Sequence, residues 1–270
     1  MHLFRSATTE LSKAIADLCS GAFFFAMRSC EYLSVSGPPR KTKRLRLRNI
    51  RFFHKKKKLL HTSPYLHKSD FISITFEDQK NDMRNETVTM HSSSHRSMCP
   101  VKCWARVVRR VLSTPKSTND SFVNTFTFNG RKAFVTSTEA VKALRAAAIC
   151  FGEKRLGFPA SDIGTHSLRS GAAMAMYLDE VPVYTIMLLG RWSSDAFLLY
   201  IRRQVEQFSH NVSSRMIRNM NFTHVPNYEP HTTRYDPRTR NHRDNAQTRL
   251  NMGVSSRDII PTLPNFSIHT

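Results

Sequence analysis

The segment Gly164-Thr-His-Ser-Leu-Arg-Ser-Gly171 carries two basic side chains, His166 and Arg169, that are three residues apart. Residues with this spacing lie on the same face of a helix, and the apolar residues that follow keep a helical spacing. The start of a helix also offers unpaired N–H groups and partial positive charge. We therefore expect His166 and Arg169 to face one anion at the beginning of a helix.

The next segment is Leu189-Gly-Arg-Trp-Ser-Ser-Asp-Ala-Phe-Leu-Leu-Tyr-Ile201, which presents Arg191, Trp192 and, nine residues after Arg191, Tyr200. A His-x-x-Arg element followed by Gly, then His or Trp, and then a spaced Tyr is similar to the C-terminal signature of the tyrosine recombinases, the phage integrase family. The sequence of residues 164–202 looks most like that of the recombinases of eukaryotic mobile elements of the DIRS and Crypton kinds.

This resemblance implies a fold and two further site residues. The fold is α+β: a mainly helical tyrosine-recombinase catalytic domain with a small antiparallel β-sheet over residues 1–220. From the composition, which turns polar and contains several prolines, we expect a disordered tail at residues 221–270. The family's first arginine lies near a helix end and precedes a glutamate, a pattern that Arg28 and Glu31 match. The family's catalytic lysine lies on a β-hairpin, and Lys80 occupies that place between two expected strands.

The chemistry implied is DNA strand transfer through a 3′-phosphotyrosine intermediate, without a metal or another cofactor. Arg28 and Arg169 would clamp the two non-bridging oxygens of the scissile phosphate, because forked guanidinium donors match such an anion. Tyr200 would attack phosphorus and release a 5′-hydroxyl. Lys80 would protonate the leaving oxygen, and His166 would assist proton transfer or hydrogen-bond the phosphate.

One position departs from the usual family pattern. Most members have a histidine after the glycine, where this chain has Arg191 followed by Trp192. Counting back from Tyr200 selects Arg191, whereas family members with tryptophan at this position favour Trp192. Both residues are therefore candidates for the hydrogen-bond donor at this place in the site.

The net charge independently indicates a polyanionic partner. The 270 residues include 41 Lys and Arg against 20 Asp and Glu, a formal charge of +21, and 40% hydrophobic residues, enough for a buried core. An anionic membrane is the weaker alternative, because the longest apolar run, Gly21–Met27, is far shorter than the roughly 20 residues of a spanning helix. We expect double-stranded DNA as the partner and neither a membrane nor a small-molecule cofactor.

About half of the net charge lies in residues 40–58, which hold 11 basic residues and no acidic one. Basic and apolar side chains alternate from Arg44 to Arg48, which predicts a strand with one buried face and a row of guanidinium groups on the other. A solvated strand face, or a nuclear import signal in Lys55–Lys58, is the alternative to phosphate contact, which we favour. The expected DNA-binding residues are Arg44, Arg46, Arg48, Arg51, Lys55, Lys56, Lys57 and Lys58.

Local patterns predict the remaining elements. Strands at residues 71–76 and 85–90 flank a turn signal at Asn81-Asp82, which indicates a small antiparallel sheet. A helix is expected from Val101 to Leu112, just after Pro100. Further helices are expected after a capping box at Thr136–Glu139, at about residues 166–178 and 182–189, and at residues 194–220.

The five cysteines are scattered and odd in number, and two of them lie within apolar helical patterns. This distribution fits reduced thiols in a cytosolic or nuclear protein. Cys99 and Cys103 have a spacing that zinc ligands use, but no second ligand pair follows at the spacing of a zinc finger. We therefore expect these two cysteines to pack rather than to bind metal.

The leading hypothesis is a site-specific DNA recombinase that acts as a multimer of itself on paired sites, in the nucleus or, in a prokaryote, in the nucleoid. A first alternative is a catalytically inactive or domesticated relic of a mobile element that binds DNA without chemistry. A second alternative, a basic RNA-binding protein, explains only the charge, because none of the aromatic-rich strand motifs of common RNA modules is apparent.

Overall fold

The computed structural model describes residues 7–38, 40–78, 84–93, 95 and 97–192. These residues form an α+β structure with one four-stranded and one two-stranded antiparallel sheet. The helices are α2 (Glu10–Phe24), α3 (Ser29–Tyr32), α4 (Pro100–Leu112), α5 (Ser137–Phe151), α6 (Glu153–Leu156), α7 (Ser167–Leu178) and α8 (Val183–Gly190). The strands are β1 (Ile50–His54), β2 (Lys57–Leu59), β3 (Phe71–Asp78), β4 (Arg84–His91), β5 (Thr125–Phe128) and β6 (Arg131–Phe134).

The larger sheet has the strand order β2-β1-β3-β4, and all of its neighbouring strands are antiparallel. The hairpin of β3 and β4 confirms the strands expected at residues 71–76 and 85–90. Along β3, alternate side chains enter the core, and Ile72, Ile74 and Phe76 are almost fully buried. This is the pattern of a strand with one face against the core.

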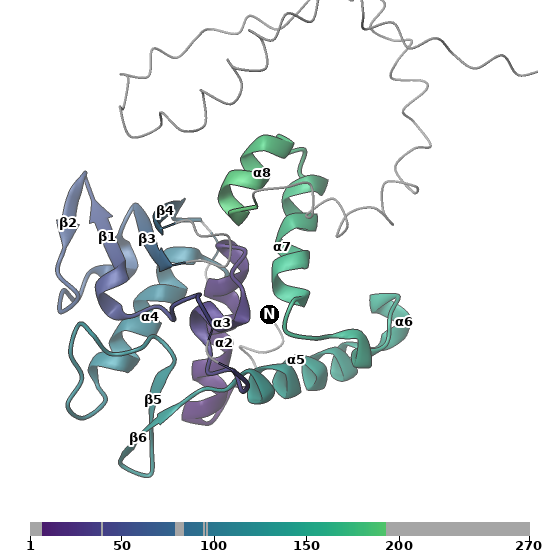
Figure 1. Ribbon diagram of the computed structural model, residues 1–270, viewed down its shortest axis with the longest axis horizontal. Helices are drawn as coiled ribbons and strands as arrows, with labels where there is room; N and C mark the ends of the chain where they lie inside the picture. The colour runs from purple at the N-terminus through teal and green to yellow at the C-terminus, as the bar shows by residue number, and fades with distance from the viewer. Residues whose placement is uncertain (1–6, 39, 79–83, 94, 96, 193–270) are drawn as a thin grey trace, which may run out of the picture. The chain divides into compact units, whose positions relative to one another are not determined.

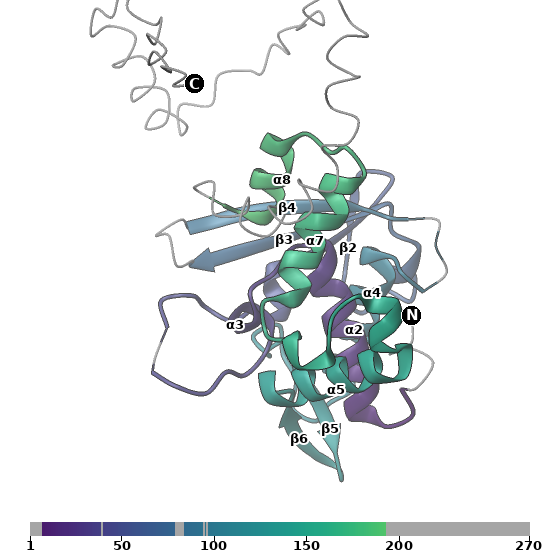
Figure 2. The same ribbon diagram turned by 90° about the vertical axis from the view of Figure 1, so that its right-hand side faces the viewer.

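Helix α2 lies at the centre of the core. It packs against α4, α5 and α7, and Figures 1 and 2 show it between the larger sheet and α7. The close approach of α2 and α4 depends on Gly21, because a Cβ there would lie 2.8 Å from Nε1 of the buried Trp104. This packing holds the end of α2, from which the candidate site begins.

The helix starts follow the sequence signals. The hydroxyl of Thr136 accepts the N–H of Glu139 at 3.2 Å, and the Glu139 carboxylate accepts the N–H of Thr136 at 2.8 Å, so the capping box is confirmed. α4 begins at Pro100, where a missing N–H has little cost. The helices expected at about residues 166–178 and 182–189 are α7 and α8.

The strand expected from Arg44 to Arg48 is wrong. A 3₁₀ turn, Leu47–Asn49, lies there, and β1 begins only after it. The Oδ1 of Asn49 accepts the N–H of Arg46 at 2.7 Å, and the N–H of Asn49 donates to the Arg46 carbonyl at 3.0 Å. Both leucines of the stretch are nevertheless buried. The alternating pattern therefore indicates which side chains face the core. An Asn-closed turn follows Arg46, which forms only an isolated antiparallel bridge with Phe122.

Two hairpins, β1–β2 and β5–β6, are not among the elements expected above. The first turns at Lys55 and Lys56, which have φ of 47° and 63°, although lysine is not a residue that favours this conformation. The second turns at Asn129-Gly130, with φ of 48° and 72°. Asn-Gly is the usual signal for such a turn, so β5–β6 was readable from the sequence.

Several sequence predictions fall outside the described residues. They are the positions of Lys80 and Tyr200, the turn at Asn81-Asp82, the helix at residues 194–220, and the tail at 221–270 with its boundary at residue 220.

The five cysteines are free thiols, and Cys99 and Cys103 are buried. Within the described part of the chain, no group of three or more His, Cys, Asp or Glu side chains could hold a metal ion. Among the helices described above, none is long and apolar enough to cross a membrane.

Candidate active site

Arg28 follows a tight turn at the end of α2. Phe25, Ala26 and Met27 are buried in this turn, and the N–H of Met27 donates to the Ala22 carbonyl at 3.0 Å. Ala26 has a φ of 43°, in the left-handed region that alanine rarely adopts. The apolar run therefore leaves the helix after Phe24, and Arg28 projects as the residue that precedes α3.

Glu31 joins Arg28 to Arg191. Its side chain has no exposed surface, and its carboxylate accepts the backbone N–H of Arg28 at 2.8 Å and the Nη1 of Arg28 at 3.2 Å. The same carboxylate accepts the Nη2 of Arg191 at 2.8 Å. A buried carboxylate is costly unless it is paired and hydrogen-bonded. Glu31 therefore couples the position of Arg28 to that of the residue after α8.

Arg191 is a buried structural link rather than part of an open surface. Its side chain is fully covered, its Nη1 donates to the Phe25 carbonyl at 3.0 Å, and its Cζ lies 3.6 Å from the ring centroid of Phe76. Burial lowers the pKa of the Arg191 guanidinium, and the charge of Glu31 opposes this shift. Arg191 thus fastens the end of α8 to the end of α2 and to β3.

Arg169 lies in the first turn of α7 and is only 3% exposed. Its Nη2 donates to the Gly190 carbonyl at 2.6 Å, and its Nη1 donates to the Ala26 carbonyl. Its Cζ lies 4.2 Å from the ring centroid of Trp192. The guanidinium is therefore held by the turn after α2, which is distant in the sequence, and by the end of α8, the next helix along the chain.

Trp192 takes its place because residue 190 is glycine. A Cβ at Gly190 would overlap the Trp192 ring. The backbone N–H of Trp192 donates to the Met187 carbonyl at 3.0 Å, and a small core around Ala173 and Ile186 packs against the ring. The ring therefore lies on the Arg169 guanidinium, supported by α7 and α8.

Four of the expected catalytic residues line one cavity of about 760 Å³, which we call the Arg169 cavity. They are Arg28, His166, Arg169 and Trp192, and His166 is the exposed residue that precedes α7. The remaining lining residues are Ser29, Cys30, Val35, Arg40, Lys41, Thr42 and Thr165. A cavity with this set of side chains is suited to an anion.

The structure separates the two candidates for the position after the glycine. Trp192 lines the Arg169 cavity. Arg191 does not line it, and its guanidinium donates to the Phe25 carbonyl and to the Glu31 carboxylate instead. Lys80 and Tyr200, which complete the expected catalytic set, lie outside the described residues.

The basic block of residues 40–58 divides into several environments. Arg44 and Arg46 line a second cavity of about 550 Å³ with Phe122, which we call the Phe122 cavity. Arg48 lies at its edge, where its Nε donates to Glu77 at 3.0 Å and its Nη1 pairs with Asp120. All three arginines of the expected row therefore line one cavity, but two acidic side chains already hold the third.

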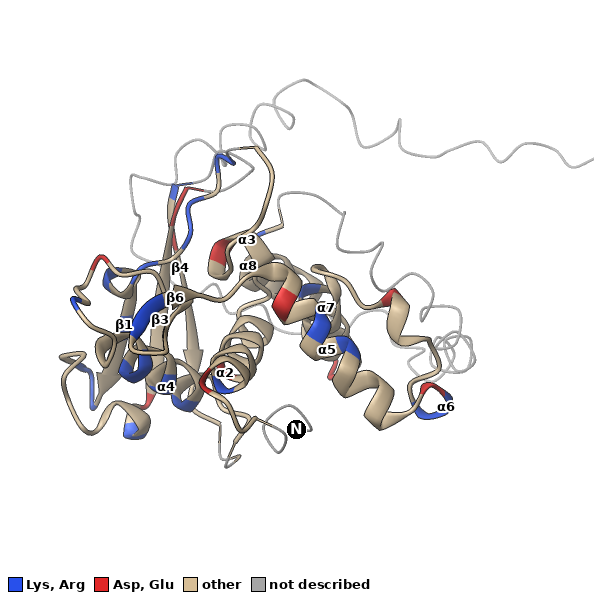
Figure 3. Cartoon of the chain, turned by 90° about the horizontal axis from the view of Figure 1, so that it is seen from below, with Lys and Arg blue, Asp and Glu red and all other residues tan. Residues whose placement is uncertain are grey.

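The other expected DNA-binding residues lie on the larger sheet. The Nη2 of Arg51 donates to the Thr75 hydroxyl at 2.5 Å, on the polar face of the sheet. Lys55, Lys56, Lys57 and Lys58 are all exposed, on the β1–β2 hairpin. Figure 3 shows the blue Lys and Arg positions along β1 and the chain beside it.

The cavities also contain residues that the sequence patterns did not single out. Arg40 and Lys41 belong to the basic block, so the charge pattern could have found them, and Thr42 follows them in the chain. Phe122 had no signal of its own, because its role depends on contact with arginines far away in the sequence.

Comparison with known proteins adds no family assignment. No protein-family model matches this chain, and a search of curated proteins finds no match. Function is therefore inferred from the residues of the site and from their geometry.

Proposed function

We propose that this chain is a tyrosine-type DNA strand transferase that cuts and rejoins double-stranded DNA through a 3′-phosphotyrosine. One observation carries the proposal: Arg28, His166, Arg169 and Trp192, which come from three separate segments of the chain, line a single basic cavity. These four are among the seven residues that the resemblance to tyrosine recombinases selects. Their convergence in one cavity favours a shared function.

In the proposed reaction, Arg28 and Arg169 bind the non-bridging oxygens of the scissile phosphate. The Tyr200 oxygen attacks phosphorus, the bond to the 5′-oxygen breaks, and Lys80 gives a proton to that oxygen. His166 takes the tyrosine proton or hydrogen-bonds the phosphate, and Trp192 supplies the donor that a histidine provides in most family members. The released 5′-hydroxyl reverses these steps on a partner strand, so no metal or nucleotide cofactor is required.

The fixed orientation of Arg169 supports this assignment. Two buried carbonyls and the Trp192 ring hold its guanidinium before any ligand arrives. Donors that are held in place in a site of low dielectric stabilise developing charge more than mobile ones do. We further propose a recombinase domain of the mobile-element kind, acting as a multimer on paired DNA sites in the nucleus.

The direct test is covalent capture. The full-length chain is incubated with a labelled library of nicked DNA duplexes whose sequence is randomised around the nick, and products are separated on denaturing gels. We expect a protein–DNA adduct that Tyr200→Phe abolishes and that Tyr184→Phe, an exposed tyrosine on α8, retains. Absence of any adduct from the wild-type protein, at DNA concentrations that saturate binding, would count against catalysis.

A second candidate, a DNA-binding protein without chemistry, is favoured by a different observation. Arg28 and Arg169 already donate to Glu31, Ala26 and Gly190. A pure binder would retain DNA affinity in filter binding, give no adduct with Tyr200 intact, and show equal affinity in the Tyr200→Phe variant.

A further inference from the structure

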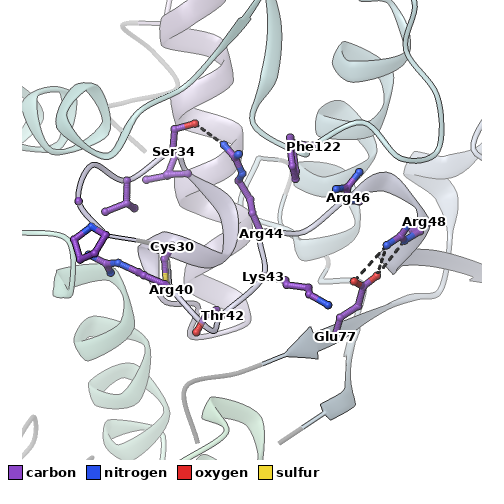
Figure 4. A pocket seen from close by; sticks show the side chains of 14 residues that line it. Cys30, Ser34, Arg40, Thr42, Lys43, Arg44, Arg46, Arg48, Glu77 and Phe122 are labelled. Carbon is purple, nitrogen blue, oxygen red and sulfur yellow. Dashed lines mark hydrogen bonds and ion pairs between the residues drawn. The ribbon is translucent and has the colours of Figure 1, made fainter. Parts of the chain in front are cut away.

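The Phe122 cavity is built around one aromatic ring flanked by two guanidinium groups. The Cζ of Arg44 lies 3.9 Å from the ring centroid of Phe122, and the Cζ of Arg46 lies 4.6 Å from it. Figure 4 shows Arg44 and Arg46 beside Phe122 at one wall of the cavity. A ring that contacts both planar groups restricts their orientation.

Neutral oxygens hold these two arginines. Nη1 of Arg44 donates to the hydroxyl of Ser34 at 2.5 Å, and Nη1 of Arg46 donates to the backbone carbonyl of Asp120 at 2.8 Å. Within the described residues, no carboxylate forms a salt bridge with either guanidinium. Burial lowers the pKa of the Arg44 guanidinium, and the neighbouring charge of Arg46 adds to this shift. Two adjacent positive charges without a counter-charge favour a bound anion.

Arg48 provides an internal contrast. It lines the same cavity, but its guanidinium is paired with Glu77 and Asp120. Figure 4 shows its contacts with Glu77 turned away from Phe122. Of these three arginines, Arg44 and Arg46 therefore carry the unneutralised charge, and Arg40 lines the same cavity.

The Phe122 cavity adjoins the Arg169 cavity. Both cavities are lined by Cys30, Val35, Arg40 and Thr42. A flexible polyanion that enters one cavity can therefore continue into the other across Arg40. A nucleic-acid strand has the required form, because it carries one negative charge at each successive phosphodiester.

We propose that the Phe122 cavity binds a second phosphodiester, on the same DNA strand whose scissile phosphate lies in the Arg169 cavity. The identity of the strand rests on the proposed function, whereas the anion site rests on Arg44, Arg46 and Phe122 themselves. The two forked guanidiniums hold the phosphodiester oxygens, and the Phe122 ring restricts their orientation. The site fixes where the strand lies relative to the reacting phosphate and carries no chemistry of its own.

The test measures how DNA affinity depends on salt. The full-length chain is titrated into a fluorescein-labelled duplex of mixed sequence, by anisotropy, over a series of NaCl concentrations. Replacing both arginines, in Arg44→Gln/Arg46→Gln, is expected to lower the slope of log K against log salt by about 0.9, the value for one phosphate contact. Arg48→Gln is the matched control, and we expect its slope to equal that of the wild type.

The proposal is overturned if the double variant keeps the wild-type slope, or if Arg48→Gln lowers the slope as much as the double variant does. Circular dichroism melting establishes that each variant is folded. Phe122→Leu keeps every charge and most of the apolar volume, so it provides a second route if the double variant fails to fold. We expect Phe122→Leu to weaken binding several-fold at constant salt, and unchanged affinity in this variant would also overturn the proposal.

Two further measurements distinguish free phosphate from a DNA phosphodiester as the bound anion, and the second phosphodiester site from the proposed strand-transfer function. Inorganic phosphate at constant ionic strength is expected to leave the melting temperature of the wild type and of the double variant equally unchanged; selective protection of the wild type would indicate a site for the free ion. If the wild type forms the adduct and the double variant keeps the wild-type salt slope, the proposal of a second phosphodiester site is refuted and the strand-transfer proposal is not. If the double variant has a reduced slope but the wild type forms no adduct, the strand-transfer proposal is refuted, and the DNA-binding role of the Phe122 cavity is retained.

Discussion

The Arg169 cavity and the Phe122 cavity both contain arginines, but they hold them in different ways. At the Arg169 cavity, Arg169 and the neighbouring Arg191 are each 3% exposed. Arg169 donates to the buried Gly190 carbonyl, and Arg191 donates to the Glu31 carboxylate. In the Phe122 cavity, Arg44 and Arg46 rest on an aromatic ring and donate to neutral oxygens.

The difference separates two uses of positive charge. A guanidinium that satisfies buried acceptors is part of the folded core, and its removal leaves those acceptors unpaired. A guanidinium at a surface cavity is available for binding, and its removal costs the fold little. Four variants test this division, and the expected effects run from the largest to the smallest.

The largest expected effect is on the stability of Arg191→Met. This variant leaves the fully buried Glu31 carboxylate without its closest arginine contact, and such a break costs about 3–5 kcal/mol of the free energy of unfolding. Urea denaturation measures the loss. Arg48→Met is the control, because that arginine pairs at the surface, and we expect its midpoint to stay near that of the wild type. Equal losses in the two variants would remove the distinction between arginines that are part of the core and arginines at the surface.

The second effect concerns catalysis at Arg169. We expect Arg169→Lys to reduce the rate of adduct formation by about a hundredfold to a thousandfold, because lysine cannot present a fork to two oxygens. Affinity for DNA should change much less, since the charge is kept. Arg46→Lys is the paired control and should form adduct at close to the wild-type rate when DNA is saturating. A rate for Arg169→Lys within a few-fold of wild type would speak against the clamp.

The third effect distinguishes Trp192 from Arg191. Trp192→Phe keeps an aromatic ring beside Arg169, but it removes the indole N–H together with part of the bicyclic ring that packs against Ala173 and Ile186. If this donor contacts the reacting phosphate, adduct formation should slow by about tenfold, the equivalent of one hydrogen bond. The melting temperature should fall only slightly, because the smaller ring still covers part of the core of α7 and α8. A rate equal to that of the wild type would show that the indole N–H is not used.

The smallest effect is a pH dependence at Glu77. Hydrogen bonds from Arg48 and Asn49 lower the pKa of this carboxyl in the folded chain. A lowered folded pKa stabilises the protein above the unfolded pKa of about 4.3, and the contribution disappears as the pH falls through the folded value. The free energy of unfolding should therefore fall less steeply below about pH 5 in Glu77→Gln than in the wild type. Parallel curves would mean that the Glu77 contacts are not maintained in solution.

Part of the fold and of the site was predictable because some signals are local. The hairpin of β3 and β4, the capping box at Thr136, and α7 with His166 and Arg169 at its start all depend on residues within a few positions of one another. The strand at Arg44–Arg48 failed because Asn49 closes a turn, which competes locally with an extended conformation.

The amino-acid sequence by itself determined the charge, most of the helices, and which residues are candidates for chemistry. Only the tertiary structure decided that Trp192 rather than Arg191 lines the cavity, and that Phe122 lies between Arg44 and Arg46. Both outcomes depend on contacts between residues that are distant in the chain. A buried charge is stable only where a partner such as Glu31 neutralises it, and the residues near Arg191 in the sequence do not indicate that partner.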